Sequence, residues 1–200
     1  MPAYFSIDIS IEKERIYEGI YADYIDILDK NGIRFSSGYW DYMDESLESV
    51  IRWNEEKIRE DYDLPVNEPY SNDYKQILLE YKHFSEVRTY IINDKDSDEI
   101  DFSIIIPEDE LLTMKNGRVT FNEIVMEDIK ELVLNLWKWT CVGAIQTALE
   151  LSDGRTSIKK LREGASPSVE PFAIIPKEYF ENGSKYRVHD VERDGALLEQ

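Results

Sequence analysis

The sequence predicts an α+β domain in which a mostly antiparallel sheet packs against several helices. Three observations support this prediction. Short segments with alternating apolar and polar residues are typical of half-buried strands. Longer segments with apolar residues three and four positions apart indicate amphipathic helices. Two of the strand patterns are separated only by a short acidic loop, which favours a hairpin and therefore antiparallel pairing.

The first expected element is a strand, followed by a helix. Residues 3–11 (AYFSIDISI) alternate β-forming residues with small or polar ones. Residues 12–30 then carry apolar or aromatic side chains at helical spacing. Asn31 and Gly32 are a typical helix end, because both tolerate the left-handed conformation. A short strand is expected over 33–35.

The next stretch, GYWDYMDESLE over residues 38–48, mixes aromatic and acidic side chains. Apolar positions further on predict a helix over about 45–60, with Asp44 as its N-cap. Capping and the helix dipole account for the acids of this stretch. They do not account for Tyr39, Trp40 and Tyr42, which lie upstream of the expected cap.

The middle of the chain alternates loops with short elements. Residues 60–73 hold two prolines and many turn formers and predict a loop, and 73–81 is expected to be a short helix. Residues 87–93 (VRTYIIN) and 99–106 (EIDFSIII) predict the two strands of a hairpin. Pro107 and the three acids after it indicate a helix start.

Residues 121–152 predict a long buried central helix. Thr120 and Glu123 have the spacing of a capping box. The polar positions that follow form one narrow stripe on an otherwise apolar surface, which is typical of a helix buried on most sides. A short strand over 118–125 is the alternative at its start. Strands over 171–175 and 185–191 and then a polar tail complete the chain.

The charge is large and uneven. The 200 residues carry a net charge of −19, from 42 acids and 23 bases. Residues 1–110 hold 28 acids and 11 bases, whereas residues 111–200 hold 14 and 12. We therefore expect a single domain, 1–200, with an acidic first part (1–110) and a near-neutral second part (111–200). This charge disfavours nucleic-acid binding. It fits a solubilising surface or a basic partner.

The sequence shows neither a signal peptide nor a convincing membrane span, so we expect a cytoplasmic protein that does not bind membranes. The basic run from Arg155 to Arg162 either pairs with its own acidic surface or meets an anion, and we favour the former.

No catalytic motif is present, and we expect neither an enzyme nor a cofactor. His83 and His189 are far apart in sequence, and Cys141 lies in an apolar segment as an inert core thiol. Residues 94–98 have the first spacings of a calcium loop, but Glu99 replaces its glycine, so no metal site is expected. An enzyme with an unrecognised carboxylate site stays the alternative.

In size, charge and lack of catalytic motifs, the chain resembles the small acidic immunity proteins with which bacteria neutralise a cognate toxin. The resemblance implies a protein-binding inhibitor that masks a basic toxin or another basic protein by covering its cleft. A structural or regulatory subunit of an oligomer is a further alternative, and the sequence leaves the oligomeric state open. The residues expected to contact the partner are Tyr39, Trp40, Asp41, Tyr42, Asp44, Asp61, Tyr62, Asp63, Glu68 and Tyr70.

Overall fold

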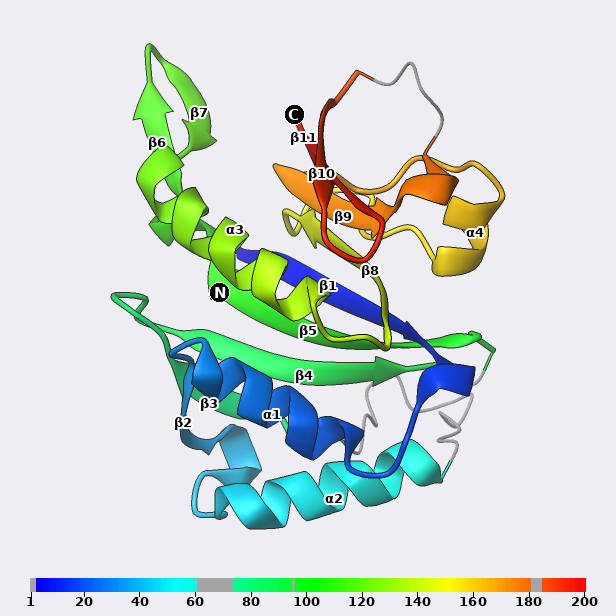
Figure 1. Cartoon of the computed structure of the whole chain (residues 1–200). Helices are drawn as coiled ribbons and strands as arrows, with labels where there is room; N and C mark the ends of the chain where they lie inside the picture. The colour runs from blue at the N-terminus through cyan, green and yellow to red at the C-terminus, as the bar shows by residue number, and fades with distance from the viewer. Residues whose placement is uncertain (1–2, 61–73, 95, 181–184) are drawn as a thin grey trace.

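The computed structural model describes residues 3–60, 74–94, 96–180 and 185–200. Its main feature is a nine-stranded sheet with the order β10-β11-β9-β8-β1-β5-β4-β3-β2 (Figure 1). All neighbouring strands in this sheet are antiparallel. The predicted α+β class is therefore confirmed.

The strands of the sheet are β1 (Tyr4–Glu12), β2 (Arg34–Gly38), β3 (Ile77–Glu80), β4 (Val87–Asn93), β5 (Glu99–Pro107), β8 (Val142–Ala148), β9 (Phe172–Pro176), β10 (Arg187–Val191) and β11 (Gly195–Glu199). A separate hairpin consists of β6 (Leu112–Lys115) and β7 (Arg118–Phe121). The helices are α1 (Ile20–Lys30), α2 (Leu47–Arg59), α3 (Glu123–Trp137) and α4 (Ile158–Arg162). Single 3-10 turns are η1 (Lys13–Arg15), η2 (Trp40–Tyr42), η3 (Glu108–Glu110) and η4 (Lys177–Tyr179).

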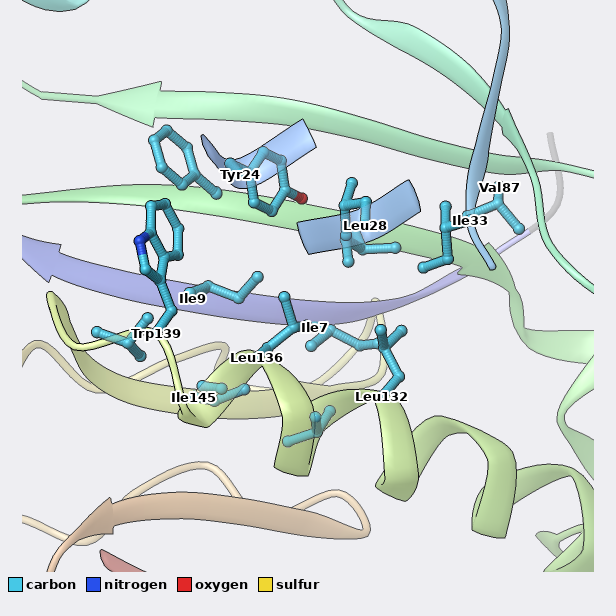
Figure 2. Packing of buried hydrophobic residues seen from close by; sticks show 14 of the residues in the cluster. Ile7, Ile9, Tyr24, Leu28, Ile33, Val87, Leu132, Leu136, Trp139 and Ile145 are labelled. Atoms are coloured by element: carbon cyan, nitrogen blue, oxygen red, sulfur yellow. The ribbon is translucent and has the colours of Figure 1, made fainter. Parts of the chain in front are cut away.

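The central strand β1 separates two different faces of the sheet. Its odd-numbered residues from 5 to 11 belong to the main core, which also contains buried residues of α1 and α3. Figure 2 shows Ile7 and Ile9 among side chains from both helices. In the same core the rings of Tyr24 and Phe102 stack at 4.8 Å. The even-numbered residues of β1 are polar and point to the opposite face, because side chains alternate along a strand.

A second, smaller core lies on that opposite face, towards the β9 and β11 side of the sheet. It joins Ala144 of β8 and Leu198 of β11 to Ile158 and Leu161 of α4. The short helix α4 thus covers one part of the polar face of β1 and β8.

The predicted long helix over 121–152 is wrong in its second half. The helix α3 ends at Trp137, and residues 142–148 form the strand β8. Every residue of β8 is buried, because the strand lies between β1 and β9 and is covered on both faces. Such a strand has a continuous apolar sequence that periodicity cannot distinguish from a buried helix.

Arg193 holds the turn between α3 and β8. Its guanidinium donates hydrogen bonds to the carbonyl oxygens of Trp137, Trp139, Thr140 and Val142. It also lies 4.6 Å from the centre of the Trp137 ring. One side chain from the β10–β11 turn therefore binds carbonyls that the end of the helix leaves without partners.

Other predicted elements also need correction. Residues 77–80 are the strand β3 and not part of a helix, and Ser46 replaces Asp44 as the N-cap of α2. The helix expected over 12–30 begins only at Ile20, and the predicted helix start after Pro107 is a single 3-10 turn. The alternative strand after residue 118 is correct as β7, and Asn122 caps α3. The expected polar tail contains the buried strand β11. The strands predicted at 3–11, 33–35, 87–93, 99–106, 171–175 and 185–191 are confirmed with small shifts.

We predict that Arg193→Lys lowers the free energy of unfolding by about 2–3 kcal/mol, because an ammonium cannot reach four carbonyls at once. Urea denaturation measures the change. Arg187→Lys is the matched control, since Arg187 is exposed and makes one 3.3 Å bond to the Gln200 carbonyl. Equal stability of the two variants would contradict this role for Arg193.

Candidate protein-binding surface

The stretch 39–44, which holds the predicted contact residues Tyr39, Trp40, Asp41, Tyr42 and Asp44, forms a tight turn at the edge of the sheet, where β2 leads into η2. Gly38 makes this turn possible: a Cβ atom there would lie 2.0 Å from the Tyr42 carbonyl oxygen. The turn is also tied to the sheet, because the Tyr39 amide donates a 3.0 Å hydrogen bond to the Gln76 carbonyl. Only glycine allows η2 to fold so closely onto the end of β2.

Trp40 is 74% exposed, more than any other aromatic side chain in the described part of the chain. Its φ angle of 54° lies in the left-handed region, which a bulky residue rarely adopts. Its ring stacks on Tyr39 with 5.6 Å between centroids. The backbone and the stacking together present the indole to solvent in a defined orientation, and strain of this kind is common at functional sites.

Tyr39 is itself held by a cation. The Arg88 guanidinium lies 4.5 Å from the centre of the Tyr39 ring and 4.5 Å from that of Tyr4. Glu86 forms an ion pair with Arg88 at 2.8 Å and accepts a 3.0 Å hydrogen bond from the Tyr4 hydroxyl. This arrangement connects the turn to β4 and β1.

Tyr42 packs inward against a second cation. The buried Lys75 ammonium lies 4.9 Å from the Tyr42 ring centre and 4.5 Å from that of Trp53 on α2. It also pairs with Glu45 at 2.5 Å, and this hydrogen bond is the main cause that lowers the pKa of the Glu45 carboxyl. Cation–aromatic contacts of this kind strengthen when they are desolvated.

The acids of the turn divide into two groups. Glu45 forms an ion pair with the buried Lys75. Asp41 and Asp44 are exposed and make no ion pair with any described residue. Since Ser46 caps α2, helix capping does not explain Asp44. The turn therefore presents Trp40 together with two exposed carboxylates.

Only part of the predicted contact surface can be located. Asp61, Tyr62, Asp63, Glu68 and Tyr70 lie outside the described residues. Sequence reasoning also missed members of the surface. Met43 lies close to Trp40 in the chain and is 65% exposed, but the prediction for residues 38–48 did not include it among the contact residues. The supporting cations Lys75 and Arg88 come from distant parts of the sequence, so no local signal could have found them.

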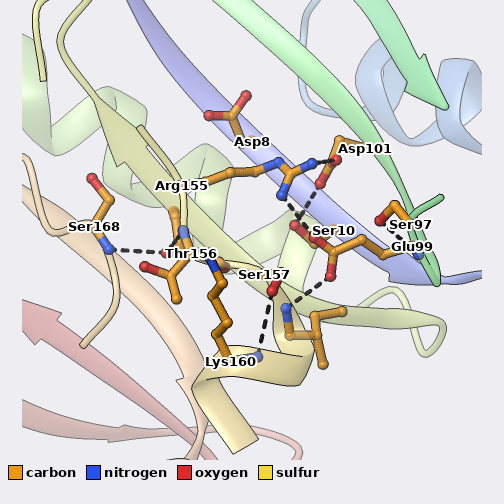
Figure 3. A network of polar contacts seen from close by, with 12 residues as sticks. Asp8, Ser10, Ser97, Glu99, Asp101, Arg155, Thr156, Ser157, Lys160 and Ser168 are labelled. Atoms are coloured by element: carbon orange, nitrogen blue, oxygen red, sulfur yellow. Dashed lines mark hydrogen bonds and ion pairs between the residues drawn. The ribbon is translucent and has the colours of Figure 1, made fainter. Parts of the chain in front are cut away.

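The central strands bury a second candidate site, a cluster of carboxylates around Arg155 (Figure 3). Arg155 pairs with Glu99 at 2.7 Å and also with Asp101. Asp101 accepts a 2.6 Å hydrogen bond from the Ser10 hydroxyl, and Asp8 accepts one of 2.6 Å from Ser103. The expectation that the basic run pairs with the protein's own acids is thus confirmed for Arg155.

This cluster fastens the segment before α4 to the sheet. The second carboxylate oxygen of Glu99 accepts from the Ile158 amide at 2.8 Å, in the first turn of α4. Arg162 at the other end of α4 pairs with Glu12 at 2.6 Å. The acids of β1 and β5 therefore hold α4 at both ends.

Within this cluster the carboxyl group of Asp101 has a raised pKa. Burial raises its pKa to about 7, and the nearby Arg155 charge opposes this rise. A carboxyl group with such a pKa can serve in proton transfer. However, the 680 Å³ cavity beside the cluster is lined by Glu99 and not by Asp101 or Asp8. Arg155 and Ser10 occupy the positions that a substrate would need.

Three further observations concern metal ligands, the thiol and membranes. No group of three or more metal-binding side chains occurs among the described residues. The Cys141 thiol is buried, and burial raises its pKa to about 12, as expected for an inert thiol. In the described part of the chain, no helix is both long enough and apolar enough to cross a membrane.

No protein-family model and no curated protein matches this chain.

We predict that Gly38→Ala lowers the free energy of unfolding by about 1–3 kcal/mol, because the new methyl group must displace the Tyr42 backbone. Urea denaturation measures it, with the exposed neighbour Ser36→Ala as the control. If the Gly38→Ala variant proved as stable as the control, the turn would not be packed as described.

We also predict a pH-dependent effect of Asp101→Asn. The folded-state pKa of Asp101 is about 7 against an ordinary value of 3.8, so the folded protein binds this proton more tightly. The contribution of Asp101 to stability therefore falls as the pH rises from 3.8 to about 7. Asparagine imitates the protonated acid and removes this dependence, which amounts to at most about 4 kcal/mol.

Urea midpoints at a series of pH values test this prediction. As the pH rises from 3.8 to about 7, the urea midpoint of the Asp101→Asn variant should increase relative to that of the wild type. The exposed loop variant Asp98→Asn is the control. A constant difference between wild type and Asp101→Asn would mean that Asp101 is ionised throughout.

Proposed function

We propose that this chain is a protein-binding inhibitor whose Trp40 turn (residues 38–45) captures a basic partner. The observation that carries the proposal is the exposure of Trp40 on a turn that the fold holds in place. A protein that needs only solubility gains nothing from a 74% exposed tryptophan with φ at 54°. Tryptophan side chains on rigid supports are frequent anchors of protein interfaces.

The charges around the turn favour a basic partner. Asp41 and Asp44 are exposed in the same turn as Trp40, and the whole chain has a net charge of −19. A field of one sign accelerates the encounter with a partner of the other sign. An Arg or Lys side chain of the partner would stack on the exposed indole and pair with either carboxylate.

An immunity-type role follows from the same features. An acidic protein that binds the basic cleft of a toxin inhibits it by occupying the cleft, and this needs no catalytic group. Size, charge and the resemblance noted above support this interpretation. Under this proposal Met43 joins Trp40 in the apolar centre of the interface, and the acids form its rim.

The alternative of an enzyme with a carboxylate site finds less support. Asp101 has a suitable pKa, but Arg155 and Ser10 already use its oxygens. Buried ion-pair networks of this kind also shift pKa values without catalysis. Binding through the Trp40 turn is the function that the geometry supports best.

An affinity capture from lysate of the source cells tests the proposal. The immobilised wild type should retain one basic protein in near-equal amount at low salt, and less of it at high salt. Trp40→Ala should weaken binding by at least about 30-fold, the effect expected of an interface anchor. The double variant Asp41→Asn and Asp44→Asn should mainly reduce the salt dependence.

Leu151→Ala serves as the matched control, because Leu151 is 97% exposed and lies outside the Trp40 turn. Circular dichroism verifies that all variants are folded. The proposal fails if Trp40→Ala and wild type retain the same proteins in equal amounts.

A further inference from the structure

The guanidinium of Arg88 is held by two aromatic rings beside the Trp40 turn. It lies 4.5 Å from the centres of both the Tyr4 and the Tyr39 rings, and its side chain is only 12% exposed. Contacts between a guanidinium and aromatic rings strengthen as they are desolvated. Tyr39 also stacks on Trp40, so one ring contacts both the guanidinium and the exposed indole. Arg88 is therefore fixed next to the proposed anchor of the partner surface.

Arg88 lies on a face of the sheet that no described helix covers at this position. Its neighbours Val87 and Thr89 on β4 are buried, and Val87 belongs to the main core. Because side chains alternate along a strand, Arg88 points to the opposite face. On that face the short helix α4 packs over β8 and β9, away from β4 (Figure 1). A binding partner can therefore approach the sheet at Arg88.

The N–H groups of Arg88 are nearly unused. A guanidinium has five N–H donors. The Nε atom lies 2.8 Å from a Glu86 oxygen, yet it is buried and makes no hydrogen bond of regular geometry. The two terminal nitrogens donate to no described acceptor and are not fully buried. The nearby Tyr4 hydroxyl can take up only part of this capacity. Because largely buried donors without acceptors are unfavourable, the arrangement favours an acceptor supplied by another molecule.

A carboxylate is the acceptor that this site fits best. The planar guanidinium matches the two oxygens of a carboxylate with two parallel hydrogen bonds. A free anion is repelled by the net charge of −19. The carboxylate must therefore belong to a molecule that the acidic surface attracts. A basic protein with one acidic side chain among its bases meets both requirements.

We propose that Arg88 binds a carboxylate side chain of the basic partner, next to the Trp40 turn that binds the partner's basic residues. The inference rests on the proposed function and adds a requirement to it, since the partner must place an Asp or Glu close to the base that contacts Trp40. A polycation without such an acid would cover Arg88 and leave it unpaired, which disfavours binding. Arg88 thus discriminates the partner from other basic proteins.

Titration with sodium acetate, exchanged for sodium chloride at constant ionic strength, tests the carboxylate site without any partner. In protein labelled with ¹³C,¹⁵N-arginine, the Nε–H and Cζ resonances of Arg88 should shift and saturate. We expect a dissociation constant of about 10–100 mM, as for one pair of charged hydrogen bonds. The Arg88→Lys variant assigns these resonances by their loss.

Arg34 is the matched control in this titration, because it is exposed and has neither an ion pair nor a ring contact in the described ranges. Its resonances should not saturate. Equal responses of Arg34 and Arg88 to acetate, or no response of Arg88, overturn the proposal.

The protein captured by the wild type provides the second test. Arg88→Gln should raise its dissociation constant at least about tenfold, and Arg34→Gln should leave it unchanged. Surface acids of the partner are then changed singly to Lys. One of these partner variants should lose affinity for the wild type and regain it with Arg88→Glu, because the two charges are exchanged. Circular dichroism verifies that the variants are folded.

The outcomes separate this inference from the proposed function. If Arg88→Gln binds the captured partner as tightly as the wild type does, or if Arg88→Glu restores no partner variant, the inference is wrong while the Trp40 turn can still be the binding surface. If nothing is captured, the proposed function fails. A saturable acetate response would then assign Arg88 to a free carboxylate ligand, which overturns a partner side chain as its occupant.

Discussion

The pairing of Arg155 with the acids of β5 is the interaction on which the rest of the structure depends. The centre of the sheet buries Asp8, Glu99 and Asp101, and burial of charge is unfavourable unless a partner compensates it. Arg155 provides that partner for Glu99 and Asp101 and brings the segment before α4 onto the polar face of the sheet. The second core beneath α4 can form only because this segment is fixed there. One face of the sheet is thus held by apolar packing and the other by a buried ion network.

Cations have a common role throughout this acidic protein. Arg155 binds acids of β5, Arg193 binds the carbonyls that end α3, and Lys75 and Arg88 lie against the aromatic rings that support the Trp40 turn. All four side chains are buried or half-buried. Asp41 and Asp44 of the Trp40 turn remain exposed beside these supports, and exposed carboxylates fit the proposed basic partner.

The sequence predicted those elements whose signal is local. The alternation of apolar and polar residues over 3–11 predicts a strand with one apolar face, as β1 has. The acidic loop after residue 93 predicts the β4–β5 hairpin. The prediction from sequence failed where the position of a segment in the folded protein determines whether it is a helix or a strand. Residues 142–148 are apolar throughout most of their length because β8 is covered on both faces, and the same composition fits a buried helix. The aromatic turn was found from Tyr39 and Trp40, which capping could not explain. The cations that support this turn could not be predicted, since Lys75 and Arg88 approach it only in the folded sheet.

The central claim is that Trp40 is the anchor of a partner-binding surface. The most direct test is ¹⁹F NMR of the chain labelled with 5-fluorotryptophan, with lysate of the source cells added at low salt. Only four resonances are visible, one for each of the 4 tryptophans, and the buried Trp137 and Trp139 act as internal references. Substitution of Trp40 by Phe assigns its signal. The account predicts that the lysate shifts the Trp40 resonance and leaves those of Trp137 and Trp139 in place. An unchanged Trp40 resonance in a lysate from which the chain captures a protein would contradict it, because binding would then occur elsewhere.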